Sequence, residues 1–226
     1  MPPRHLRIYT ALEIEARAVA NALGVPFRPP VTVAPGVLAG TIPISLHLIG
    51  IRASCIPACQ AQDHVSVIVL AGLAGALDPS LRCGDVVVDD PSRLLRLENP
   101  STFHFGPIHT SDRIIATPSE KAELFRTTRA LAVDMETEIV RRAADKASAT
   151  CIVVRSISDS ADQTLDPSIL GLVDSQGRVK PIAVAATLVR RPHVLPQMLQ
   201  TRARTRVALE ALSRAVAAIV RSLSPG

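Results

Sequence analysis

The sequence predicts an α/β fold in which a central sheet is flanked by helices. Along the chain, apolar segments with strand-like composition alternate with segments of helical periodicity, an order typical of α/β folds. The 226 residues, 47% of them hydrophobic, suffice for one substantial core. We therefore expect a single domain over residues 1–226, with a basic helical segment from about residue 181 onward.

The expected elements follow in chain order. Strands are expected at residues 6–12, 37–38, 42–49, 64–70 and 84–88, and residues 132–159 indicate strand, helix and strand. Helices are expected at 13–23 (ending at Gly24), near 57–62, from Pro118 to about 129, and, with breaks at Pro192 and Pro196, from 181 to 223. Turns or irregular segments are expected at 71–79, 93–105, 161–167 and 172–177.

The composition argues against several classes of function. Only 2% of the residues are aromatic and Trp is absent, which disfavours stacking platforms for single-stranded nucleic acid. The net charge of +5 comes mostly from Arg, but no helix-turn-helix, zinc or RNP pattern accompanies it. We expect no nucleic-acid partner.

The basic C-terminal segment leaves two interpretations open. Its arginines lie among apolar residues, a pattern suited to peripheral contact with anionic lipid headgroups. Packing against the protein's own core or a partner subunit is the commoner explanation. The arginines concerned are Arg190, Arg191, Arg202, Arg204 and Arg206.

The cysteines point to a reducing compartment. Cys55, Cys59, Cys83 and Cys151 fit neither a disulfide framework nor a zinc site, so we expect no bound metal. The N-terminus carries no apolar signal core, and no apolar run approaches membrane-spanning length. A cytoplasmic, metal-free protein is the expectation.

Carboxyl groups follow three of the expected strands. Within the strand–helix–strand segment, Glu136 stands where the helix begins and Asp159 stands just past the second strand; Glu13 and Glu15 lie just after the first strand of the chain. Ligands of open α/β sheets bind at the carboxyl ends of strands, so these groups are candidates for one pocket. In such a pocket, one carboxyl group can bind hydroxyls of the ligand while another transfers a proton. For Glu13 and Glu15, an ordinary interaction with the helix dipole is an equally good explanation.

The glycine-containing segment Ala71–Pro79 does not match a dinucleotide-binding loop. It supplies Gly72 and Gly75 but not the full Gly-x-Gly-x-x-Gly, and Asp78-Pro79 follows where a long helix should begin. Its small residues still allow backbone amides to approach a bound sugar or anion closely, so Gly72 is a candidate substrate-binding residue.

Five segments, in order and with compatible spacing over residues 6–162, resemble the purine nucleoside phosphorylase and uridine phosphorylase superfamily, which includes the methylthioadenosine/S-adenosylhomocysteine nucleosidases. They are Ala11-Leu-Glu-Ile-Glu15, Ala71-Gly-Leu-Ala-Gly through Gly84-Asp-Val-Val-Val88, Thr110-Ser-Asp112, Val133-Asp-Met-Glu136 and Val154-Arg-Ser-Ile-Ser-Asp-Ser-Ala-Asp162. The resemblance implies a three-layer phosphorylase/hydrolase-like fold with a central mixed twisted sheet. It also implies cleavage of the N-glycosidic bond of a purine nucleoside, with release of adenine.

The resemblance implies a role for each matching residue. Glu136 would bind the ribose 2′- and 3′-hydroxyls with Met135 packed on the sugar, and Asp159, supported by Ser158, would act as the acid at purine N7. Glu15 would activate water. Backbone groups near Ile114 and Ile115 would contact the purine edge, and Arg155 would support this end of the pocket.

The nucleophile is water or phosphate. Leu70 and Leu73 stand where the resemblance places an Arg and a Ser or Thr that hold phosphate, and apolar side chains cannot bind a dianion. With Glu15 as base, hydrolysis is favoured without any cofactor; inorganic phosphate would be the co-substrate of the alternative phosphorylase. Leu73 also departs from the nucleosidase pattern, which has Ser there.

The C-terminal third is more similar to the hopanoid-associated phosphorylase branch, through Leu165-Asp-Pro, Gly177-Arg-Val-Lys-Pro181 and Arg190-Arg-Pro. That branch is associated with removing adenine from adenosylhopane, so the purine nucleoside would be lipid-linked. The resemblance also implies a homo-oligomer. A nucleoside-binding protein without turnover is the competing interpretation, and an adenine-release assay separates the two.

Overall fold

The computed structural model describes residues 5–28, 31–34, 42–57, 65–165 and 195–223. Their strands form one nine-stranded mixed sheet in the order β2-β3-β1-β4-β9-β5-β6, in which β8 pairs with both β4 and β7. The strands are β1 (Leu6–Thr10), β2 (Val31–Ala34), β3 (Ile44–Leu48), β4 (Val67–Ala76), β5 (Val86–Asp89), β6 (His104–Phe105), β7 (Ile108–Thr110), β8 (Ala132–Asp134) and β9 (Thr150–Asp159). The helices are α1 (Glu13–Leu23), α2 (Pro118–Thr128), α3 (Thr137–Lys146) and α6 (Leu195–Leu223), with short 3-10 turns η1 (Ile51–Ala53) and η3 (Pro100–Thr102).

The four central strands run parallel. β3, β1, β4 and β9 are neighbours in parallel register, so their carboxyl ends lie at one edge of the sheet. β8 runs antiparallel to the end of β4, with Gly75 opposite Val133. This pairing brings the residues that follow β8 to the same edge.

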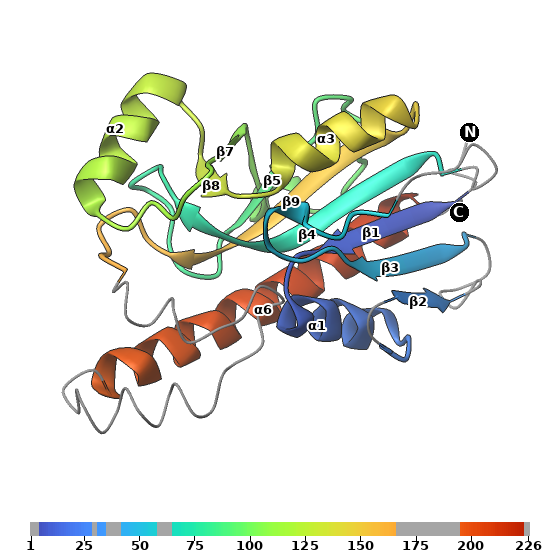
Figure 1. Ribbon diagram of the computed structural model, residues 1–226, viewed down its shortest axis with the longest axis horizontal. Coiled ribbons are helices and arrows are strands. Elements are labelled where there is room, and N and C mark those ends of the chain that lie inside the picture. Colours follow the sequence, from blue (N-terminus) through green and yellow to red (C-terminus); the bar gives the residue numbers. More distant parts are fainter. Residues whose placement is uncertain (1–4, 29–30, 35–41, 58–64, 166–194, 224–226) are drawn as a thin grey trace.

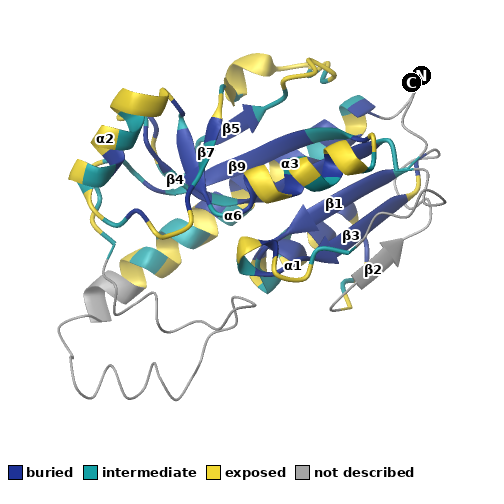
Figure 2. Ribbon diagram, turned by 45° about the horizontal axis from the view of Figure 1, so that its top comes forward, coloured by how far each residue is buried: buried dark blue, intermediate teal, exposed yellow. Residues whose placement is uncertain are grey.

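Helices cover both faces of the sheet, giving the expected three layers. α1 and α6 lie on one face and α3 on the other (Figure 1). One core cluster joins α1 and α6 to side chains of β1, β3, β4 and β9, and a second lies between the opposite face and α3. The central strands are accordingly buried along most of their length (Figure 2).

Several expected elements are confirmed. α1 spans residues 13–23 and ends at Gly24, whose φ of 65° is the left-handed cap that glycine favours. α2 begins at Pro118 behind the N-cap Thr117, and residues 132–159 form β8, α3 and β9.

Other expectations were wrong. Residues 71–76 are not a turn, because β4 continues through Ala76 and pairs with β9 along this stretch. α6 starts at Leu195, so Pro196 lies in its first turn and does not break it, since proline is tolerated where backbone N–H groups have no helical partner. The segment 93–105 contains η3 and β6. The elements expected at 37–38, 58–62, 172–177 and 181–194 lie outside the described residues.

The C-terminal helix packs onto the core. The apolar side of α6, including Leu212, Val216 and Ile219, belongs to the core cluster on the face it shares with α1. Arg206 pairs with Glu210 on the exposed side at 2.9 Å. Among the described helices, none combines the length and the apolar character needed to cross a membrane.

Candidate active site

A cavity of about 230 Å³ opens at the sheet edge where β1, β4, β8 and β9 end. Its wall contains Glu15, Asp134, Glu136 and Asp159, together with mostly apolar neighbours. A larger cavity of about 500 Å³ lies between α6 and the segment 96–103, and Glu98 is the one acidic residue in its lining. The smaller cavity is therefore the candidate active site.

The cavity wall contains seven of the nine residues predicted for the site. Gly72 and Arg155 are not in the wall, but Gly72 lies beside Glu15 and Arg155 donates to Glu136. The seven are Glu15, Ile114, Ile115, Met135, Glu136, Ser158 and Asp159.

Glu15 is held by backbone amides from two elements. Its Oε2 accepts hydrogen bonds from the amides of Ala11 (3.1 Å) and Leu12 (2.9 Å) at the start of α1, and Oε1 accepts one from Leu73 of β4 at 2.8 Å. Burial disfavours the charged form and raises the pKa of Glu15 to about 7, although the Arg155 cation and the Leu73 and Leu12 amides oppose the shift. A carboxyl group with a pKa near 7 is suited to general-base chemistry at neutral pH.

Glu136 lies between a backbone amide and a buried cation. Its Oε1 accepts a hydrogen bond from the Arg52 amide at 2.9 Å, and its Oε2 lies 3.2 Å from Nη2 of Arg155. Burial also raises the pKa of Glu136, with the Arg155 charge acting in the opposite direction. The loop that supplies the Arg52 amide is conformationally strained, because Arg52 and Ala53 have φ values of 57° and 50°.

Arg155 is surrounded by carboxylates. Its side chain is fully buried, and Nε and Nη2 both donate to Oδ2 of Asp134. Glu15 and Glu136 contribute further negative charge around it. Three carboxyl groups thus face one guanidinium.

Glycine at position 72 makes this arrangement possible. A Cβ atom there would lie 2.1 Å from Nη1 of Arg155 and 3.0 Å from Oε1 of Glu15. No side chain larger than hydrogen fits between the two. Gly72 therefore brings the backbone of β4 against Glu15 and Arg155.

Asp159 is fixed from both sides at the end of β9. Its Oδ1 accepts a hydrogen bond from Oγ of Ser158 at 2.9 Å, and its Oδ2 accepts one from Nζ of Lys121 at 2.6 Å. A Cβ at Gly75 would come within 2.9 Å of Oδ2, so this glycine again allows a close approach.

Three residues that contribute to the site were not predicted from the sequence. Asp134 stands within the Val133-Asp-Met-Glu136 segment, where a carboxylate at the end of a strand was a usable signal. Arg52 contributes through its backbone amide, which its residue type does not reveal. Lys121 lies in a helix that also carries the exposed Glu123 and Arg126, so nothing in the sequence distinguishes it from a surface lysine.

The described residues contain no group of three or more His, Cys, Asp and Glu side chains placed to bind a metal ion. The acidic groups of the cavity are instead occupied by hydrogen bonds to backbone amides, Ser158, Lys121 and Arg155.

Comparison with known proteins agrees with the fold. Residues 92–190 match the family model described as the phosphorylase superfamily. The structure superposes on that of a Helicobacter pylori 5′-methylthioadenosine/S-adenosylhomocysteine nucleosidase with a TM-score of 0.62 and 18% identity, over 99% of this chain and 98% of that one. The protein has a phosphorylase-superfamily fold.

Two further structures support that assignment. The S. pneumoniae nucleosidase of the same name, bound to a transition-state inhibitor, gives a TM-score of 0.63 at 18% identity, covering 97% of this chain and 100% of that one. The H. pylori futalosine hydrolase gives 0.61 at 18% identity, covering 98% and 97%. No curated protein matches the sequence at a significant level. The predicted resemblance to this superfamily is confirmed.

Proposed function

We propose that the protein cleaves the N-glycosidic bond of a purine nucleoside by hydrolysis and releases adenine. The observation that carries this proposal is the presence of Glu15, Glu136 and Asp159 in the wall of one cavity at the carboxyl ends of the central strands. The structurally similar proteins include two methylthioadenosine/S-adenosylhomocysteine nucleosidases and a futalosine hydrolase, which supports the same class of reaction.

Each carboxyl group has a task in this reaction. Cleavage develops positive charge on the ribose and negative charge on the departing base. Glu136 binds the ribose hydroxyls and orients the sugar, and these contacts strengthen as charge develops. Asp159 gives a proton to N7 of the purine, and Glu15 takes a proton from the attacking water. Met135 packs on the sugar, and Ile114 and Ile115 lie against the base.

The charge balance beside Glu15 favours water over phosphate. Asp134, Glu136 and Glu15 surround the guanidinium of Arg155, which already donates to two of them, and the guanidinium of Arg113 in the cavity wall is paired with Glu120. A phosphate dianion would add charge of the same sign to this group, and Leu73 offers it no side-chain donor. Water requires only a base, which Glu15 provides.

The apolar lining indicates the kind of nucleoside. Leu12, Ile51 and Leu165 add apolar surface to the cavity, which suits an adenosine whose 5′ substituent is apolar. The resemblance of the C-terminal third to the hopanoid-associated branch suggests adenosylhopane as one such substrate. Apart from Leu165, the residues that carry this resemblance lie outside the described residues.

An adenine-release assay tests the proposal. Purified protein is incubated with adenosine, methylthioadenosine and an adenosyl-lipid, and free adenine is quantified by chromatography. We expect release from at least one substrate and a much lower rate for Glu136→Gln with the same substrate. Tight nucleoside binding without adenine release would instead identify a binding protein.

A further inference from the structure

Lys121 is a buried cation directly behind the proposed acid. Its side chain is 0% exposed, although α2 otherwise presents several charged residues to solvent. Burying an ammonium group is costly unless it is paired and hydrogen-bonded. Nζ donates to Oδ2 of Asp159 at 2.6 Å, to the Ser160 carbonyl at 2.7 Å and to the Gln163 carbonyl at 3.1 Å.

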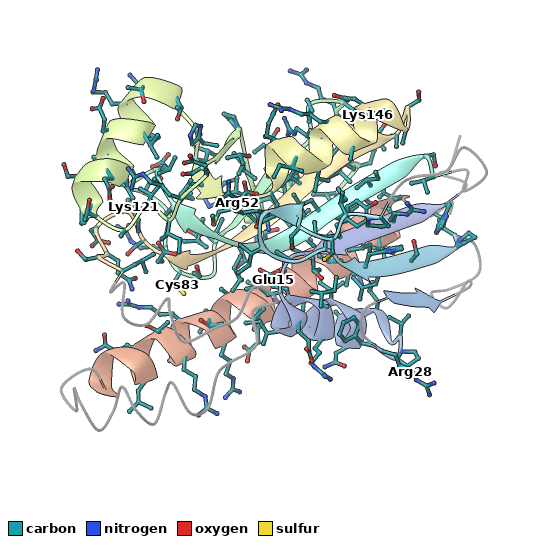
Figure 3. The ribbon with its side chains drawn as sticks, in the orientation of Figure 1. Glu15, Arg28, Arg52, Cys83, Lys121 and Lys146 are labelled. Atoms are coloured by element: carbon teal, nitrogen blue, oxygen red, sulfur yellow. The ribbon has the colours of Figure 1, made fainter. Side chains whose placement is uncertain are left out.

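The two partners of Asp159 differ in their relation to the cavity. Ser158 lies in the cavity wall beside Asp159, whereas Lys121 does not line the cavity. Lys121 reaches Asp159 from α2, at the end of the sheet opposite to the exposed Lys146 of α3 (Figure 3). The carboxyl group offered to the purine is thus joined by one short hydrogen bond to a cation that the cavity wall hides.

A purely structural role does not require this pair. Replacing a buried ion pair by well-packed apolar residues is often neutral or stabilising. The carbonyls of Ser160 and Gln163 accept hydrogen bonds from Lys121 and fix the chain after β9, but these two bonds alone do not require an ammonium group next to Asp159. The ion pair lies where a nucleoside reaction needs a proton.

We propose that Lys121 supplies, through Asp159, the proton that the departing purine takes up; this rests on the proposed glycosidic cleavage. As the C1′–N9 bond breaks, its electron pair stays on the purine and N7 takes a proton from the Asp159 carboxyl. Nζ of Lys121 transfers a proton to that carboxyl, so Asp159 remains a carboxylate at the end of the step.

The remaining protons balance through the nucleophile. Water adds to C1′ and gives its proton to Glu15. After product release, Glu15 returns a proton to solvent and Lys121 regains one. In this scheme Lys121 never touches the substrate, and its effect passes entirely through Asp159.

A double-mutant cycle tests this dependence. Lys121→Met is measured for adenine release in the wild type and in the Asp159→Asn background, with Lys146→Met as the control that removes an exposed lysine. We expect Lys121→Met to lower kcat by about 10²-fold, with KM changed by less than about 3-fold. In the Asp159→Asn background the same substitution should cost less than about 3-fold, and Lys146→Met should have no effect in either.

Two outcomes overturn the relay. The first is a loss from Lys121→Met that is equally large with Asp159→Asn present, and the second is a folded variant with wild-type kcat. If Lys121→Met does not fold, Lys121→Gln carries the test, since its amide keeps a donor but has no ammonium. A wild-type kcat in Lys121→Gln overturns the relay, and a kcat lowered to the same extent supports it. Failure of the wild type to release adenine would contradict the proposed function itself.

Discussion

Oε1 of Glu15 accepts a hydrogen bond of 2.8 Å from the backbone amide of Leu73, which joins the start of α1 to β4 across 58 positions of the chain. A backbone amide, and not a side chain, therefore orients the proposed base. The site tolerates leucine at position 73 because the side chain is not needed to hold Glu15.

The raised pKa of Glu15, about 7, predicts the pH dependence of activity. A general base must be ionised, so kcat/KM should fall about tenfold per pH unit below 7 and level off above it. Glu15→Gln should lower kcat by about 10²-fold or more and remove this limb. Glu13→Gln is the matched control, because Glu13 lies in the same turn but pairs with Arg17 at 2.6 Å. An unchanged pH profile in Glu15→Gln would count against Glu15 as the base.

The same residue predicts a dependence of stability on pH. The pKa of Glu15 is raised from 4.5 to about 7, so between these values the folded protein binds more protons than the unfolded chain. The free energy of unfolding of the wild type should therefore fall by about 3 kcal/mol as pH rises from 4.5 to 7, and that of Glu15→Gln should lack this decrease. Urea unfolding at pH 5 and pH 8 measures the difference. Parallel losses in both proteins would show that Glu15 is not the group responsible.

Asp159→Asn should damage turnover far more than binding. The asparagine keeps the size of the side chain but has no proton to give to N7, so kcat should fall by about 10²–10⁴-fold. KM should change by less than about 3-fold, since the contacts of Glu136 with the sugar remain. Steady-state kinetics with the best substrate measures both values. A rate equal to that of the wild type would remove Asp159 from the mechanism.

Gly72→Ala should disrupt the site through sterics. A methyl group at position 72 would meet Nη1 of Arg155 at 2.1 Å, and the fully buried guanidinium has little room to move. We expect a loss of about 3 kcal/mol in the free energy of unfolding together with loss of activity. Gly24→Ala provides the comparison, because nothing lies within 4 Å of its added Cβ and only its φ of 65° is unfavourable. That variant should lose about 1 kcal/mol and stay active.

The sequence was sufficient to predict the three-layer fold and the carboxyl groups that line the cavity. Strand composition and helical periodicity located β1, α1, β8, α3 and β9. The parallel order of β1, β4 and β9 brought Glu15 and Asp159 to one edge, and the antiparallel pairing of β8 with β4 placed Glu136 there as well. These features are local in the chain or follow directly from the order of its elements.

What could not be predicted depends on tertiary contacts. β4 continues through Gly72 and Gly75 because β9 pairs with it along this stretch. Glycine is needed at these two positions because the side chains of Arg155 and Asp159 lie where a Cβ atom would be. Lys121 has the sequence context of a surface residue and becomes buried only when α2 packs beside the end of β9. The pairing of Asp134 with Arg155 likewise joins residues 21 positions apart, which spacing alone does not reveal.

The most direct measurement is adenine release in buffer freed of phosphate, compared with the same reaction after inorganic phosphate is added. The account predicts full activity without phosphate, with adenine and the free sugar formed in equal amounts. A strict requirement for phosphate, with ribose 1-phosphate or its 5′-substituted form as the product, would contradict it.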